Sequence, residues 1–304
     1  MNTKRQLGPD VVRGALLTLV IFGHTFQQSV DHSHLKWMIY AFHMPLFFVL
    51  TGSLMNVEKL RHRSLLELLL YYSKRMGWQW LVATILFAMY RGVSFQNTSD
   101  VLEDFLLDPY FHLWFIPALF LMVLITWLSI KIGANHISML VIGGLTFIVF
   151  EALQIQNSVG WLNADSIDYR FAALYVWFVL GLLIAQRPPI NLWITLPMAV
   201  VGSAGMFMAF PSAGSLRDMS FFLMNAGLAG LLPHLIYTVE RIGSLRWLAP
   251  VGQFSLWIYL LHPFATDLLR KNIAPNAWWQ GLAMTIAIVV VSVACAKIVR
   301  FVQK

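Results

Sequence analysis

Three histidines lie inside long apolar stretches of the sequence: His24, His43 and His262. Histidine has an unperturbed pKa close to neutrality, which suits a general base or a proton carrier. An ionisable group within a membrane-crossing helix is costly and usually serves a function. We therefore expect these histidines to line a polar chamber. For any one of them alone, the competing interpretation is a packed interior residue with a backbone partner.

Other ionisable and aromatic side chains are expected near the same level of the molecule. These candidate substrate-binding residues are His112, Trp114, Arg170 and Glu151, together with His43 and His262. A carboxylate that oriented His24 would complete a dyad, and the sequence offers Glu151 and Asp267 without choosing between them. No metal is expected, because the His32–His34 spacing supplies no defined ligand set.

The composition determines which solvent surrounds these side chains. Of the 304 residues, 59% are apolar and 12% are charged, against about 25% charged in ordinary soluble domains. So few charges could not cover a soluble core of this size, so lipid must be the solvent. The single cysteine, Cys295, excludes a disulfide framework within one chain. Despite the net charge of +7, no basic, aromatic-interleaved segment indicates nucleic-acid binding.

A helix needs about 20 mostly apolar residues to cross a membrane. The sequence predicts an all-α, polytopic protein with about ten such helices, near 11–30, 36–55, 76–92, 112–131, 137–155, 170–186, 190–210, 219–239, 250–269 and 278–300. With both termini in the cytoplasm, 15 of the 21 Lys and Arg residues fall on the cytoplasmic side, which is the usual bias. We expect one transmembrane domain over residues 1–304. No pattern indicates an oligomeric state.

The motifs on these segments resemble those of the membrane acyltransferase family 3. Its opening motif is an acidic residue, Arg-Gly, and a histidine eleven residues after the arginine. The chain has Asp10, Arg13, Gly14 and His24 in that arrangement. The second segment, Phe42-His-Met-Pro-Leu-Phe-Phe48 with Gly52, looks like the family's proline–aromatic–Gly signature and is closest to the fucose 4-O-acetylase-like branch. His112-Leu-Trp-Phe115, Tyr175 to Gly181, and Ser255 to His262 resemble later family segments.

This resemblance implies a multi-pass acyltransferase of the bacterial inner (cytoplasmic) membrane. It would move an acyl group, commonly acetyl, from cytoplasmic acyl-CoA to a hydroxyl of an extracytoplasmic or lipid-linked sugar, as in polysaccharide modification. Its partners would be the glycan acceptor and membrane lipid. His24 and Arg13 match the family's essential histidine and arginine, so the resemblance assigns both to catalysis. On the same interpretation, His43, His112 and His262 would be oxyanion donors or sugar ligands.

The basic residues before the third segment are candidates for holding acyl-CoA. Lys74 and Arg75 belong to a cluster with Lys59, Arg61 and Arg63, and a role in setting topology is the alternative interpretation. Relatives often carry two arginines three apart and then a proline, but here Trp78 takes the second arginine's place. Arg13 lies roughly 16 Å from His24 along a helix. It would therefore bind the pantetheine–phosphate end of acyl-CoA, or pair with Asp10.

A secondary transporter or flippase for a glycan or another small polar substrate is the main alternative function. Intramembrane histidines and arginines also mark substrate and proton paths in such proteins. The sequence shows no paired halves of the kind that produce inverted repeats. An enzyme is therefore the favoured interpretation.

Overall fold

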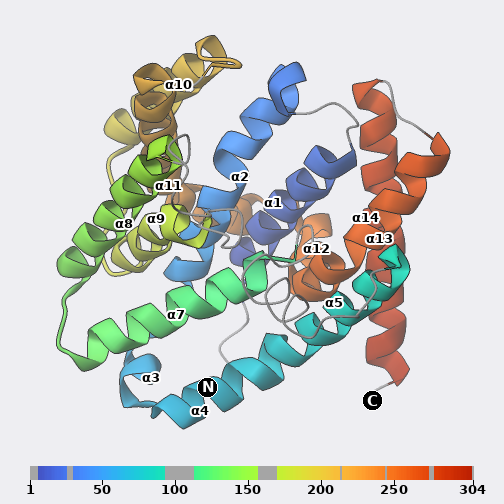
Figure 1. Cartoon of the computed structure of the whole chain (residues 1–304), viewed down its shortest axis with the longest axis horizontal. Helices are drawn as coiled ribbons and strands as arrows, with labels where there is room; N and C mark the ends of the chain where they lie inside the picture. The colour runs from blue at the N-terminus through green and yellow to red at the C-terminus, as the bar shows by residue number, and fades with distance from the viewer. Residues whose placement is uncertain are drawn as a thin grey trace. The chain divides into compact units, whose positions relative to one another are not determined.

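The chain is all-α in every part that the structure describes. The computed structural model describes residues 6–25, 30–92, 113–156, 170–212, 214–243, 245–273 and 277–302. Within these ranges the backbone forms helices joined by short turns, without a β-strand (Figure 1). The helical fold class predicted from the sequence is confirmed.

Two compact units divide the chain, one formed by residues 1–50 and 186–304 and the other by residues 51–185. The first holds α1 (Gly8–Thr25), η1 (Val30–His32), most of α2 (His34–Ser53), α10 (Leu192–Met208), α11 (Ser215–Ile242), η5 (Arg246–Leu248), α12 (Ala249–Gln253), α13 (Ser255–Ile273) and α14 (Trp278–Val302). The second holds α3 (Val57–His62), α4 (Leu65–Tyr72), the π-turn η2 (Ser73–Gly77), α5 (Trp78–Arg91), α7 (Phe115–Lys131), α8 (His136–Gln156) and α9 (Arg170–Ile184). The single domain expected over 1–304 stays a prediction.

Each of the ten predicted segments corresponds to helix in the described residues. Three helical stretches have the length and composition for crossing a membrane: His34–Ser53, Ser215–Ile242 and Trp278–Cys295. Four further apolar helices, within α7, α8, α9 and α10, are shorter. Large apolar side chains such as Trp193 and Met208 are exposed on the helices, as expected where lipid surrounds the protein. These features indicate a membrane protein, while the ten crossings and the side on which the termini lie stay predictions.

The third predicted segment, 76–92, begins earlier than expected. Helix runs from Leu65 to Arg91 through α4, the π-turn and α5. Ser64 caps its start, because the Ser64 hydroxyl accepts from the Glu67 N–H and the Glu67 carboxylate accepts from the Ser64 N–H. The extra residue per turn in a π-turn interrupts the apolar periodicity at Ser73–Gly77. The sequence pattern therefore placed the helix start too late.

Helix α1 is a central element of the first unit and packs against α11, α12, α13 and α14. Its crossing with α12 depends on two glycines. A Cβ on Gly14 would collide with the Leu248 carbonyl oxygen, and a Cβ on Gly252 would collide with the Asp10 carbonyl oxygen. Small residues allow helix backbones to approach closely in this way. Gly14 therefore has a packing role beside Arg13.

Prolines inside three helices leave backbone carbonyls for side chains to use. A helical proline lacks the N–H that would bond the carbonyl four residues earlier. Pro45 frees the Ala41 carbonyl, which accepts from Asn225 Nδ2 at 2.9 Å. Pro117 frees the Leu113 carbonyl, which accepts from Trp80 Nε1 at 2.9 Å. Pro263 frees the Tyr259 carbonyl, which accepts from His262 Nδ1 at 2.7 Å.

Candidate active site

His24 is buried in the last turn of α1, where it contacts α2. Its Nδ1 atom is 2.7 Å from the hydroxyl oxygen of Tyr40. The two rings meet edge to face, with centroids 5.7 Å apart. A base whose other ring nitrogen is hydrogen-bonded has a set tautomer and orientation. Because Tyr40 occupies Nδ1, the group that orients this nitrogen is a phenol. Glu151 and Asp267, which the sequence left open as partners of His24, stay predictions.

The residue before His24 makes room for this contact. A Cβ on Gly23 would lie 2.8 Å from Cε2 of the Tyr40 ring. Any side chain at position 23 would push the Tyr40 ring away from α1. The motif pair Gly23–His24 therefore combines a packing requirement with a candidate base.

Helix α2 is held against its neighbours on both sides of Tyr40. Trp37 Nε1 donates to the Met206 carbonyl of α10 at 3.0 Å. Asn225 of α11 donates to the Ala41 carbonyl, and its side chain is fully buried. These two bonds fix the height and rotation of the helix that carries Tyr40.

His262 stacks on His24 from α13. The ring centroids are 5.6 Å apart and the planes differ by 20°. Because the Tyr259 carbonyl can only accept, His262 Nδ1 carries the proton of that hydrogen bond. A neutral His262 thus presents Nε2 as an acceptor. Pro263, which frees the Tyr259 carbonyl, determines which nitrogen this is.

His43 completes the group from α2, with its ring centroid 5.1 Å from that of Tyr40. Its Nδ1 donates to the Ile39 carbonyl at 2.6 Å. As a neutral ring it also presents Nε2 as an acceptor. Of the two roles expected for His43 and His262, a sugar ligand fits these tautomers better than an oxyanion donor, which needs an N–H.

Arg13 lies on the same helix as His24, in the opposite half. Its Nη1 is 3.6 Å from Asp10 Oδ1, and the Asp10 side chain is 6% exposed. The pairing with Asp10, one of two alternatives from the sequence, is present. Since α1 is continuous from Gly8 to Thr25, Arg13 and His24 are separated by about three helical turns. Arg13 and His24 therefore cannot contact the same atom of a substrate.

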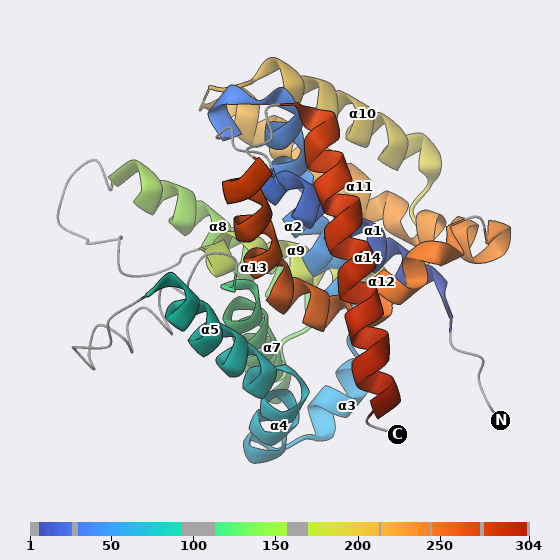
Figure 2. The same cartoon turned by 90° about the vertical axis from the view of Figure 1, so that its right-hand side faces the viewer.

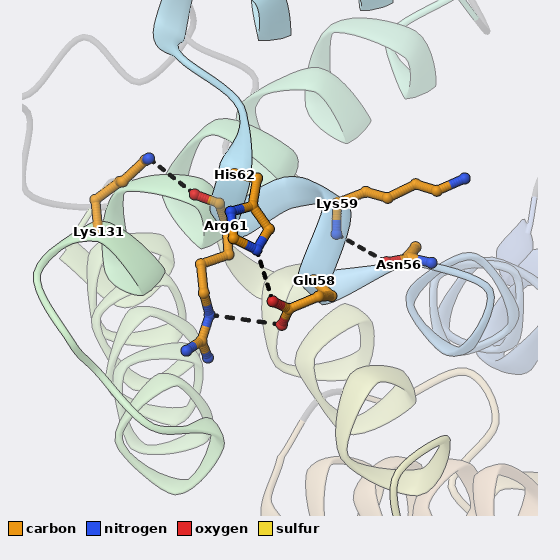
Figure 3. Close-up of polar contacts among 6 residues, drawn as sticks. All are labelled: Asn56, Glu58, Lys59, Arg61, His62 and Lys131. Atoms are coloured by element: carbon orange, nitrogen blue, oxygen red, sulfur yellow. Dashed lines mark hydrogen bonds and ion pairs between the residues drawn. The ribbon is translucent and has the colours of Figure 1, made fainter.

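The basic residues of the second unit divide into two groups. Around α3, Glu58 pairs with Arg61 at 3.9 Å and with His62 at 2.8 Å, and Lys131 Nζ donates to the Arg61 carbonyl at 2.8 Å (Figure 3). Asn56 caps the helix by accepting from the Lys59 N–H. These contacts secure the short α3 against the end of α7.

The other basic group surrounds Tyr71. The Arg63 guanidinium lies 3.8 Å from the centroid of the Tyr71 ring. Arg75, in the π-turn, donates from Nη1 to the Tyr71 hydroxyl. Lys74 lies beside it in the same turn. Two guanidiniums on one aromatic ring form a cationic surface of the kind that binds phosphate or a nucleotide.

The remaining predicted site residues are placed as follows. Trp114 is buried in the second unit, with its ring centroid 6.5 Å from that of Phe115. His112 lies outside the described residues. Glu151 and Arg170 lie on the backbones of α8 and α9, and their side chains also lie outside the description. The roles of all these residues stay predictions.

Tyr40 is the site residue that the sequence interpretation missed. Lys36, Tyr40 and His43 follow the i, i+4, i+7 spacing of one helical face. That spacing was available as a signal. A tyrosine in an apolar helix usually indicates packing, so the spacing alone did not single it out.

The comparisons with known proteins identify the family. The family model described as an acyltransferase domain, of acyltransferase family 3, matches residues 6–297. The chain belongs to this acyltransferase family. Among curated proteins, the acyltransferase is similar to "Nodulation protein NolL" of Mesorhizobium japonicum, with 27% identity over 212 residues. That match covers 61% of this chain and 49% of NolL, so it spans about half the length of the relative. No solved structure matches the chain significantly.

Proposed function

We propose that this acyltransferase is a membrane O-acetyltransferase. It moves an acetyl group from acyl-CoA on the cytoplasmic side to a hydroxyl of an extracytoplasmic or lipid-linked sugar. The observation that carries the proposal is the hydrogen bond between the buried His24 and Tyr40 in a chain of an acyltransferase family. The proposal includes ten crossings of the bacterial inner membrane with both termini in the cytoplasm, and the fucose 4-O-acetylase-like branch.

His24 acts as the general base in this scheme. Its Nδ1–H donates to Tyr40, so the lone pair of Nε2 takes the proton of the acceptor hydroxyl. The hydroxyl oxygen attacks the thioester carbonyl and forms a tetrahedral oxyanion. When that intermediate collapses, the C–S bond breaks and the CoA thiolate takes the proton from His24. The products are the sugar ester and CoA, and the base is restored.

The other residues have supporting roles. His43 and His262, each with Nδ1–H bonded to a backbone carbonyl, accept hydrogen bonds from sugar hydroxyls through Nε2. In the second unit, the cationic surface of Arg63, Tyr71 and Arg75 is a candidate for binding phosphates of the donor. Its positive charge suits that role.

The test uses purified protein in lipid nanodiscs with acetyl-CoA labelled in the acetyl group and a neutral alkyl glycoside as acceptor. We expect labelled glycoside from the wild type and a loss of about 10²- to 10⁴-fold with His24→Ala, the usual contribution of a general base. Size-exclusion profiles show whether the variant remains intact. Full turnover by His24→Ala would refute the base assignment, and glycoside uptake into vesicles without acyl turnover would favour a transporter.

A further inference from the structure

One buried threonine on α13 lacks a hydrogen-bond partner for its hydroxyl. Thr266 is 3% exposed, and its Oγ1 bonds to no other atom of the described residues. A threonine in a helix commonly satisfies its hydroxyl on the carbonyl three or four residues earlier. Thr266 does not use the His262 carbonyl in this way. A buried hydroxyl normally has a partner, so this exception requires an explanation.

The other buried threonines within the described ranges show that this exception is specific to position 266. Each of them has its hydroxyl in a hydrogen bond: Thr25, Thr84, Thr126, Thr195 and Thr285. Thr285 of α14, for example, donates to the Gly281 carbonyl at 2.8 Å. A helix therefore does not by itself leave a buried threonine hydroxyl unbonded. The hydroxyl of Thr266 is available for a group that is not part of the helix.

Thr266 lies one helical turn from a histidine of the candidate active site. Four residues of α13 separate it from His262, so the two side chains share one face of the helix. His262 in turn stacks on His24, with ring centroids 5.6 Å apart. Helix α13 packs against α1 and lies beside α14 in the same unit (Figure 2). Because one turn is only about 6 Å along the helix, a sugar that reaches His24 can also contact Thr266.

We propose that the Thr266 hydroxyl binds a second hydroxyl of the acceptor sugar, beside the one that is acylated. A hydroxyl both donates and accepts, so two hydroxyls match in either direction. Because Thr266 is buried, the acceptor reaches it only when neighbouring side chains move aside, and the bond forms on binding. Thr266 then holds the sugar in one orientation and determines which of its hydroxyls faces His24. This inference rests on the proposed function for its acceptor, but its binding can be measured without turnover.

The experiment measures acetyl transfer in lipid nanodiscs to octyl glucoside and to its 2-, 3-, 4- and 6-deoxy analogues. Thr266→Val removes the hydroxyl with little change of side-chain shape. We expect its kcat/KM for octyl glucoside to fall about fivefold or more, because a buried sugar hydroxyl then loses its partner. For one deoxy analogue, the wild type and Thr266→Val should have the same kcat/KM, since neither can form the bond. Thr266→Ser, which keeps the hydroxyl, should match the wild type with every acceptor.

Thr285→Val is the matched control, because it removes a buried threonine hydroxyl that is bonded to the Gly281 carbonyl. It should lower the thermal midpoint and keep the wild-type ranking of the acceptors. Thr266→Val should not lower the midpoint of the acceptor-free protein, because it breaks no hydrogen bond among the residues that the structure describes. A midpoint as low as that of Thr285→Val, or the same loss of kcat/KM with octyl glucoside and every deoxy analogue, would indicate a structural role and overturn the proposed contact.

Equilibrium binding of radiolabelled octyl glucoside to His24→Ala, with and without Thr266→Val, separates the two proposals. Weaker binding by the double variant, without acetyl transfer by the wild type, would support the Thr266 contact and overturn the proposed function. Acetyl transfer by the wild type, together with equal binding by the single and double variants, would support the function and overturn the contact.

Discussion

Replacing Tyr40 with phenylalanine removes one hydroxyl from the molecule and tests how His24 is held. The lost bond is the 2.7 Å contact with His24 Nδ1. In the ground state it joins two neutral groups, and a bond of that kind contributes about 0.5–1.5 kcal/mol. In the transition state His24 is becoming an imidazolium, and a hydrogen bond to a charged group contributes about 1.5–3 kcal/mol. Only the difference, about 1–1.5 kcal/mol, lowers kcat. At about 1.4 kcal/mol for each factor of ten, we expect kcat to fall about 5- to 13-fold.

The assay is the release of CoA during acetyl transfer, followed as a function of acetyl-CoA concentration. Because Tyr40 positions the base and is not among the residues assigned to the donor, KM for acetyl-CoA should change less than twofold, as expected for an interaction made in the transition state. Tyr175→Phe is the matched control: it removes the hydroxyl of the buried Tyr175, 3.1 Å from Thr126 Oγ1. It should lower thermal stability to a similar degree while preserving kcat.

The outcome that would refute this reasoning is a kcat of Tyr40→Phe equal to that of the wild type. His24 would then be oriented by another group, or Tyr40 would donate to Nδ1 and leave Nε2 protonated. A loss of the same size in Tyr175→Phe would also count against it, since general destabilisation would explain both.

Three further predictions follow from the same contacts. Gly23→Ala should displace the Tyr40 ring and lower kcat about as much as Tyr40→Phe does. The double variant should lose no more kcat than either single variant, because both changes act on one contact. Additive losses of kcat, measured by CoA release, would contradict this. Gly252→Ala should prevent a monodisperse size-exclusion peak, whereas Gly144→Ala should not, because only the first added Cβ meets backbone. Arg75→Gln should raise KM for acetyl-CoA about tenfold, the worth of one charge-assisted contact. Arg61→Gln is the control and should leave KM unchanged, because Arg61 pairs with Glu58. Equal KM values for the two variants would show that Arg75 does not bind the donor.

The sequence predicted that the apolar segments are helical and that three histidines lie near one another. Apolar runs long enough to cross a membrane have to be helical, because lipid offers no partner to an open backbone. His24, His43 and His262 were expected at one level from their positions along antiparallel segments. The structure places Tyr40 in ring contact with both His24 and His43, and it stacks His262 on His24.

What the sequence did not predict depends on details that periodicity does not encode. Short polar helices such as α3 and the π-turn at Ser73–Gly77 interrupt an apolar pattern without a compositional sign. The Tyr40 hydroxyl reaches His24 only because position 23, next to His24 in α1, is a glycine. The contact is between α1 and α2, so the pattern of either helix alone does not reveal it. The sequence offered two carboxylates, Glu151 and Asp267, as partners for His24, whereas the partner of its Nδ1 is the phenol of Tyr40.

The residues of the family motifs divide into those with a packing explanation and those without one. Gly14, Gly23 and Gly52 each face an atom of another segment that a Cβ would displace. Pro45 and Pro263 free carbonyls that Asn225 and His262 use. No comparable packing demand explains a buried imidazole at position 24, where an apolar side chain would cost less in lipid. We therefore infer a chemical role for His24, while Gly23, Pro45 and Pro263 shape the contacts that Tyr40 and His262 make with its ring.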